Sequence, residues 1–136
     1  MKQKFIVGDI VMYDNKIMVI KEPRDGICFD LYCPKERLKY CYVDVESIKP
    51  VTLTSAILEK NKWCLREHHE REFFEDVSWD SYYNPAISRI DLRFYPEEEA
   101  FFPHLYREDI SEKPIRYVHQ FQHLLFGLGI NHEMEV

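Results

Sequence analysis

Short runs of apolar and β-branched residues, separated by turn residues, occupy the first fifty positions. Ile10–Tyr13 and Ile17–Ile20 flank Asp14–Lys16, a turn whose Asp or Asn tolerates positive φ, and this pattern predicts a β-hairpin. Three further strands are expected at Ile27–Tyr32, Tyr40–Val45 and Ile48–Leu53. Five short strands at this spacing are typical of a small SH3-like β-barrel.

A short helix is expected after these strands. Thr54 is a good N-cap, and the apolar pair Leu53 and Leu58 has the spacing of a hydrophobic staple. The sequence predicts a helix over Ser55–Lys60, closed by Asn61 in the left-handed conformation.

The second half contains one clear strand pattern. Apolar and polar residues alternate along Ile87–Tyr95, which predicts a strand with one buried face. A second strand is expected near Phe73 and Phe74. Tyr82–Pro85 is expected as a turn and Phe101–Pro114 as irregular structure.

Apolar residues near the C-terminus recur at steps of three and four, as on one face of a helix. They are Val118, Phe121, Leu125 and Leu128. The sequence predicts a helix from Ile115 to about Gly129, packed on a β-scaffold. The expected fold class is α+β: residues 1–52 form an SH3-like β-module, and residues 53–136 form an α+β module with the C-terminal helix. The two modules either fold separately or share one core.

The 136 residues are 46% hydrophobic and 31% charged, which is typical of a globular protein. The N-terminus has no apolar run that would serve as a signal peptide, and no apolar window is long enough for a membrane span. We therefore expect a cytoplasmic protein that does not enter the membrane. The four cysteines are expected as free thiols, with a zinc site on Cys28, Cys33 and Cys41 as the alternative.

The net charge of −6 is unevenly distributed. Residues 1–50 have a balance of +1 and residues 51–136 a balance of −7. The acidic part disfavours broad binding of nucleic acid. Lys35, Arg37 and Lys39 alternate in the first part and form a candidate nucleic-acid contact; the alternative is that they are solvated side chains of a β-edge or loop.

Aromatic residues are concentrated between positions 73 and 106. They are Phe73, Phe74, Trp79, Tyr82, Tyr83, Phe94, Tyr95, Phe101, Phe102 and Tyr106. We expect most of these rings to be buried beneath the C-terminal helix, with a few left for a partner. Because Trp and Tyr dominate interface hot spots, Trp79, Tyr82 and Tyr83 are the candidate binding residues.

His119 and His123 share one helix face and could hold a metal ion if His132, Glu112 or His104 supplied a third ligand. The residues between them do not complete the H-E-x-x-H signature, and we expect a polar helix face without metal. The sequence has no G-x-S-x-G nucleophile motif and only four glycines. We therefore expect no enzyme and no cofactor.

Two segments, Leu53–Asn61 and Tyr117–Leu128, resemble a loose group of uncharacterised proteins from phages and mobile elements of gut Bacteroidales. The resemblance implies an origin and no mechanism. Three hypotheses follow from the sequence: a non-enzymatic module that binds a protein partner, a nucleic-acid-binding accessory protein, and a metal-dependent enzyme built on His119 and His123.

Overall fold

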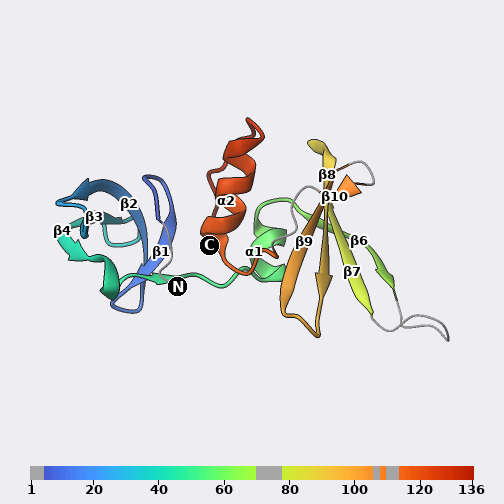
Figure 1. Ribbon diagram of the computed structural model, residues 1–136, viewed down its shortest axis with the longest axis horizontal. Coiled ribbons are helices and arrows are strands. Elements are labelled where there is room, and N and C mark those ends of the chain that lie inside the picture. The colour runs from blue at the N-terminus through green and yellow to red at the C-terminus, as the bar shows by residue number, and fades with distance from the viewer. Residues whose placement is uncertain (1–4, 70–77, 106–107, 110–113) are drawn as a thin grey trace. The chain divides into compact units, whose positions relative to one another are not determined.

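The computed structural model describes residues 5–69, 78–105, 108–109 and 114–136. The chain divides into two compact units. The first unit comprises residues 1–52 with 117–134 and 136, and the second comprises residues 53–116 with 135. In the described residues, each unit contains a five-stranded antiparallel sheet and an α-helix, which agrees with the expected α+β class (Figure 1).

The sheet of the first unit has the strand order β4-β3-β2-β1-β5. Its strands are β1 (Ile10–Tyr13), β2 (Lys16–Arg24), β3 (Cys28–Cys33), β4 (Leu38–Asp44) and β5 (Lys49–Pro50). The predicted hairpin is confirmed. Asp14 and Asn15 both have positive φ, as a two-residue turn of type I′ requires. The buried core of this sheet includes Met18, Ile20 and Leu31.

The predicted closed barrel is not found in the described strands, because the outer strands β4 and β5 do not pair with each other. The 3₁₀ helix η1 (Val45–Ser47) turns the chain back after β4. The fifth strand, expected over Ile48–Leu53, is then only two residues long and pairs with β1. Its second residue, Pro50, has no N–H to donate, so the strand cannot extend the ladder.

The C-terminal helix is confirmed as α2 (Val118–Gly127), with Val118, Phe121 and Leu125 buried. It begins three residues later than expected, because Ile115 pairs with Phe101 in an isolated β-bridge. The helix belongs to the first unit, together with residues 1–52. This grouping differs from the expected module of residues 53–136.

The second unit contains the helix α1 (Ser55–Lys60) and a sheet of order β10-β9-β8-β7-β6. The strands are β6 (Cys64–His69), β7 (Trp79–Asn84), β8 (Ile87–Tyr95), β9 (Ala100–Leu105) and β10 (Glu108–Asp109). The helix and its N-cap are confirmed: the Thr54 hydroxyl accepts a hydrogen bond from the Ile57 N–H at 3.2 Å. The residue with positive φ after the helix is Lys62 and not Asn61.

Two predictions for this sheet are wrong. Tyr82–Asn84 belongs to β7, and the turn lies in the two residues between Asn84 and Ile87. Tyr82 and Tyr83, whose aromatic side chains favour strands, extend β7, whereas the Asn-Pro pair does start the turn: the Asn84 Oδ1 accepts a hydrogen bond from the Ala86 N–H at 2.9 Å. Residues 100–105 form β9 although they include Pro103. Among the described residues, β10 pairs with His104 and Leu105 and no residue pairs with Pro103 on that side, and a strand tolerates a proline where no neighbouring strand needs its N–H.

Candidate functional site

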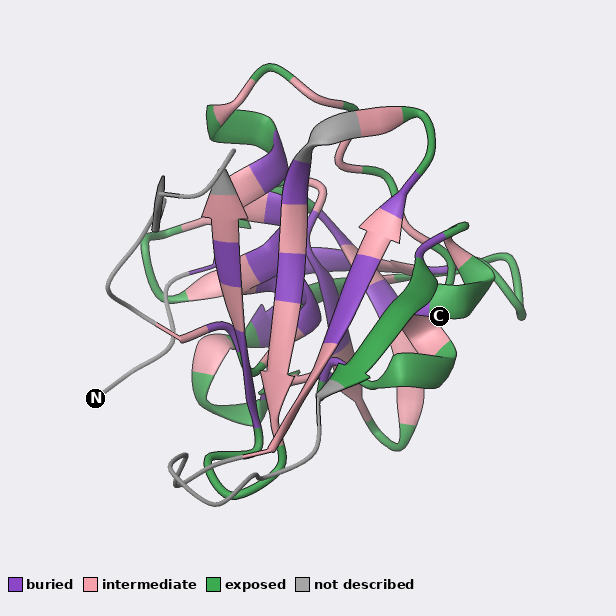
Figure 2. Cartoon of the chain, turned by 90° about the vertical axis from the view of Figure 1, so that its right-hand side faces the viewer, coloured by how far each residue is buried: buried purple, intermediate pink, exposed green. Residues whose placement is uncertain are grey.

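One face of the second unit's sheet carries aromatic and arginine side chains. Alternate residues of each strand point to the same side, and the register aligns Tyr83 with Asp91 and His104, and Arg93 with Ser81 and Phe102. We call this surface the Trp79 face. Its side chains are Cys64, Arg66, Glu67, Trp79, Ser81, Tyr83, Asp91, Arg93, Tyr95, Phe102 and His104. Bands of buried and intermediate residues follow one another along the central strand β8 in Figure 2.

Two arginines lie on the rings of this face. The Arg93 guanidinium is 4.3 Å from the ring centroid of Trp79, and the Arg66 guanidinium is 4.6 Å from that of Tyr83. Arg66 also pairs with Asp91 at 3.0 Å. Among the described residues, Arg93 has no carboxylate partner. The face therefore combines half-buried rings with a guanidinium group that no described carboxylate neutralises.

The structure separates the three predicted aromatic binding residues. Trp79 and Tyr83 lie on the Trp79 face and are half-buried, whereas Tyr82 points to the opposite face and is buried. There it packs near Phe101, with 6.1 Å between the ring centroids. Burial raises the pKa of the Tyr82 hydroxyl. Tyr82 is therefore a buried core residue and does not belong to the Trp79 face.

Burial of most of the aromatic stretch was also expected, and the described rings do not follow this expectation. Only Tyr82 and Phe101 are buried; the others are half-buried, namely Trp79, Tyr83, Phe94, Tyr95 and Phe102. The C-terminal helix, which was expected to cover the rings, belongs to the first unit. Phe73, Phe74 and Tyr106 lie outside the described residues.

The first unit contains a buried polar cluster beneath α2. Asp9, just before β1, is buried, and its two carboxylate oxygens each lie 2.9 Å from the Nε2 of His123. The same carboxylate accepts a hydrogen bond from the Ile6 N–H at 2.8 Å. Burial raises the pKa of Asp9, and the bonds to Ile6 and His123 oppose that rise.

Gln122 makes the densest set of contacts in this cluster. Its Oε1 accepts from the Ile10 N–H at 2.9 Å, and its Nε2 donates to the carbonyls of Gly8 and His132, both at 3.1 Å. These bonds tie α2 to the chain before β1 and to the C-terminal segment. Sequence reasoning missed Gln122. Its position in the sequence was the available signal: the spacing of Gln122 from Val118 and Leu125 places it beside the apolar stripe of the helix.

His119 is 2% exposed, and its Nδ1 has no hydrogen-bond partner among the described residues. Its ring lies 4.9 Å from the ring centroid of Phe5 and 5.5 Å from that of His123. Burial, with a smaller contribution from His123, lowers the pKa of His119 to about 4. The expected polar helix face of His and Gln, partly exposed or bonded to neighbouring backbone, is therefore found in part: His123 is half-buried and Gln122 bonds to backbone groups, whereas His119 is buried. Both histidines face the interior of the first unit.

No three His, Cys, Asp or Glu side chains lie close enough to hold a metal ion in the described part of the chain. Three residues were predicted as a third metal ligand beside His119 and His123. One of them, His132, accepts a hydrogen bond from the Gln122 side chain through its backbone carbonyl. His104 belongs to the second unit, and Glu112 lies outside the described residues. The Nε2 of His123 already binds the Asp9 carboxylate. The polar cluster therefore attaches α2 to the segment that precedes β1.

The predicted cations Lys35, Arg37 and Lys39 are exposed, with Lys39 on β4 and the other two in the preceding turn. The structure brings Lys39 to a residue that sequence reasoning missed. Asp30 is fully buried on β3, and its Oδ2 is 3.5 Å from the Lys39 amine. The Arg24 guanidinium donates to the same oxygen from Nε at 2.9 Å and from Nη2 at 2.7 Å.

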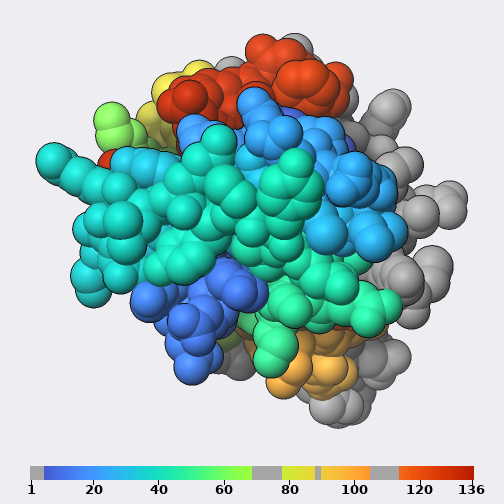
Figure 3. All heavy atoms as spheres, turned by 90° about the vertical axis from the view of Figure 1, so that its left-hand side faces the viewer, coloured from blue at the N-terminus to red at the C-terminus, as the bar shows by residue number. Residues whose placement is uncertain are grey.

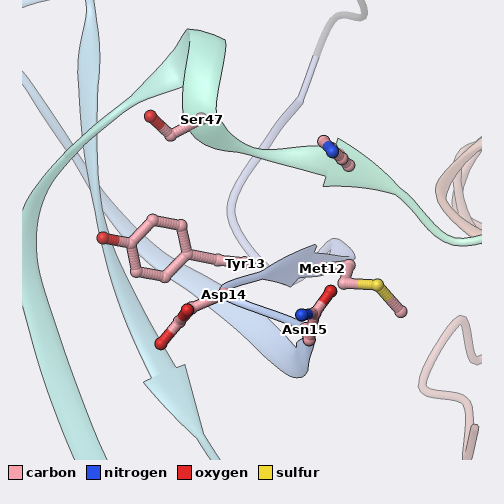
Figure 4. A pocket seen from close by; sticks show the side chains of 6 residues that line it. Met12, Tyr13, Asp14, Asn15 and Ser47 are labelled. Carbon is pink, nitrogen blue, oxygen red and sulfur yellow. The ribbon is translucent and has the colours of Figure 1, made fainter.

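One shallow pocket of about 240 Å³ lies in the first unit between the β1–β2 turn and the segment from η1 to β5. Figure 4 shows Met12, Tyr13, Asp14 and Asn15 on the hairpin and Ser47 on η1. Lys49 also lines it. Its volume is below the roughly 300 Å³ at which small-molecule pockets begin. We therefore do not assign a ligand to it.

No protein-family model, curated protein or solved structure matches this chain. No helix in the described residues is both long enough and apolar enough to cross a bilayer.

Proposed function

We propose that the protein is a non-enzymatic interaction module that binds a protein partner through the Trp79 face. The observation that carries this proposal is the stacking of Arg93 on Trp79 and of Arg66 on Tyr83. Tryptophan, tyrosine and arginine are the three residue types most enriched in interface hot spots. Here all three types lie on one face of an antiparallel sheet.

The geometry of the face supports this function. The opposite side of the same sheet carries the buried core residues Ile90, Leu92 and Phe101, which fix the strands in place. A sheet held in this way presents its outer side chains with little freedom, so a partner loses little side-chain entropy on binding. Tyr95 and Phe102, in edge-to-face contact at 5.2 Å, extend the apolar area.

The chemistry of the face also indicates what a partner must offer. Arg93 needs an acceptor, and the rings need apolar or planar groups. Arg66 is already neutralised by Asp91. We therefore propose a protein surface with a carboxylate among apolar side chains.

Comparative affinity capture tests the proposal. The full chain and the double variant Tyr83→Ala/Arg93→Ala are used as baits in a native lysate at several salt concentrations. The control bait is Phe126→Ala, which removes a ring that is 61% exposed on α2 of the first unit. Thermal unfolding establishes that all three baits are folded.

We expect one protein to be enriched by the unmodified chain and by Phe126→Ala, and reduced at least tenfold on the double variant. A bait that captures no protein at any salt concentration contradicts the proposal. Equal capture by the double variant contradicts the assignment of the binding surface to the Trp79 face.

We also propose three finer assignments. An SH3-like kinship of the first unit is supported by its strand order, with β5 beside β1, and by the 3₁₀ helix before β5. An origin in a phage or mobile element is supported by the two segments that resemble such proteins. A cytoplasmic location is supported by the free cysteines Cys28, Cys33, Cys41 and Cys64.

A further inference from the structure

We infer that the first unit has a second binding surface, which takes single-stranded nucleic acid on the outer side of β2, β3 and β4. We call it the Tyr42 face. It consists of Lys21, Arg24, Tyr32, Lys39 and Tyr42, arranged around the buried carboxylate of Asp30. The segments concerned, residues 21–42, occupy much of the surface shown in light blue and teal in Figure 3.

Contacts connect the side chains of this face to one another. Tyr32 is paired across the strands with Lys39 on β4, and the Lys21 amine lies 5.6 Å from its ring centroid. The Arg24 guanidinium lies 5.3 Å from the ring centroid of Tyr42. Each tyrosine therefore has a cation beside its ring, which is the arrangement by which proteins stack bases and meet phosphates.

Asp30 positions the face from beneath. Its Oδ2 accepts from Arg24, and its Oδ1 accepts from the Tyr42 N–H at 3.0 Å. Tyr42 has a φ of 55° at an irregularity in the β3–β4 pairing, and the residue is 58% exposed. The Arg24 guanidinium and the Tyr42 N–H lower the pKa of Asp30 to about 2. Asp30 is therefore charged at neutral pH and holds both groups in place.

The local charge favours an anionic ligand although the whole chain is acidic. Residues 21–42 contain five Lys or Arg against four Asp or Glu, a balance of +1 in a chain of −6. Of the four acids, Asp30 is buried against Arg24, Glu22 also pairs with Arg24 at 2.9 Å, and Glu36 pairs with Lys16 at 2.9 Å. Lys35 and Arg37 have no carboxylate partner among the described residues and are exposed.

The modest charge also selects the kind of nucleic acid. Three exposed cations, Lys35, Arg37 and Lys39, are too few for tight binding to a duplex by phosphate contacts alone, and Lys39 also pairs with Asp30 at 3.5 Å. A single strand offers unpaired bases, and stacking on tyrosine then adds to the phosphate contacts. The short pairing edge of β4 is interrupted at Tyr42 and carries Lys39, which disfavours the alternative of an added peptide strand.

Fluorescence anisotropy with labelled oligo-dT and oligo-U, and with a duplex of equal length, tests the inference on the full chain at low salt. Tyr42→Leu removes the exposed ring but keeps an apolar side chain. Lys35→Glu/Arg37→Glu reverses the two free cations. Its matched control is Lys60→Glu/Lys62→Glu, which reverses two exposed cations of the second unit at the same spacing, again with one at positive φ.

We expect the single strands to bind more tightly than the duplex, with a slope of log K against log salt of about −2, as for three phosphate contacts. Tyr42→Leu and Lys35→Glu/Arg37→Glu each weaken binding about tenfold, and the matched control stays within twofold.

Several results would overturn the inference: no binding of either single strand at low salt, equal binding of the duplex, or full binding by Tyr42→Leu. Binding of poly-glutamate with no binding of oligonucleotides would assign the face to an acidic polypeptide instead. None of these results tests the Trp79 face, because binding at that surface is measured with a protein partner.

Discussion

At the scale of single residues, the first unit buries an unusual set of titratable groups. Asp9 is neighbour to His123, and His119 lies within ring contact of both Phe5 and His123. Asp30 is buried separately, against Arg24. The sequence pointed to the two helix histidines, but periodicity alone could not show whether their face meets solvent or Asp9, more than a hundred positions away.

We predict that His119 makes the first unit less stable in acid. The pKa of His119 is lowered from 6.5 to about 4, so between these values the unfolded chain binds more protons than the folded one. Stability is therefore full above about pH 6.5 and falls as the pH drops to 4, by about 3 kcal/mol for this group. The raised pKa of Asp9 has the opposite effect: above pH 3.8, the contribution of this carboxyl to stability falls as the pH rises.

Urea unfolding of the full chain at pH 7 and at pH 4.5 measures this effect. In His119→Phe, which keeps a ring of similar size, most of the pH dependence is expected to disappear. The Asp9 contribution remains in that variant. An unchanged difference between the two pH values in His119→Phe would show that other groups cause the acid sensitivity.

At the scale of elements, the apolar stripe of α2 was sufficient to predict the helix but not its attachment. Val118, Phe121 and Leu125 gave the period, and all three are buried. The attachment depends on Gln122, whose three hydrogen bonds reach segments far away in sequence. The strand β9 was missed for a related reason: a proline within a strand is acceptable only where no neighbouring strand needs its N–H, and that depends on the sheet.

We predict that Gln122→Leu destabilises the protein by about 3 kcal/mol. The variant keeps the side-chain volume but leaves the buried Ile10 N–H without its acceptor and the carbonyls of Gly8 and His132 without their donor. Chemical denaturation checks the value. The control on the same helix is Phe126→Ala, whose ring is exposed and whose effect should stay within about 0.5 kcal/mol. A loss in Gln122→Leu no larger than in the control would mean that these bonds contribute nothing net.

At the scale of the whole molecule, the local patterns predicted most of the strands of the first unit and both helices. They did not predict the grouping of the elements. The C-terminal helix belongs to the unit that begins the chain, because Ile10 and Gly8 supply its polar partners. The same limit applies to the candidate site. Trp79 and Tyr83 could be selected from composition, but the exclusion of Tyr82 and the roles of Arg66 and Arg93 required the register of β6, β7 and β8.

The assignment of binding to the Trp79 face is tested most directly by the dissociation constant of the captured protein partner. This constant is measured for the variant Trp79→Ala and, as a control, for His123→Gln. Removing Trp79 takes away the ring on which Arg93 stacks, whereas His123→Gln alters the polar cluster of the other unit. We predict that Trp79→Ala weakens the complex at least about tenfold and that His123→Gln leaves it within twofold. Unchanged affinity in Trp79→Ala, with loss in His123→Gln, would contradict the proposed function and place the binding site in the first unit.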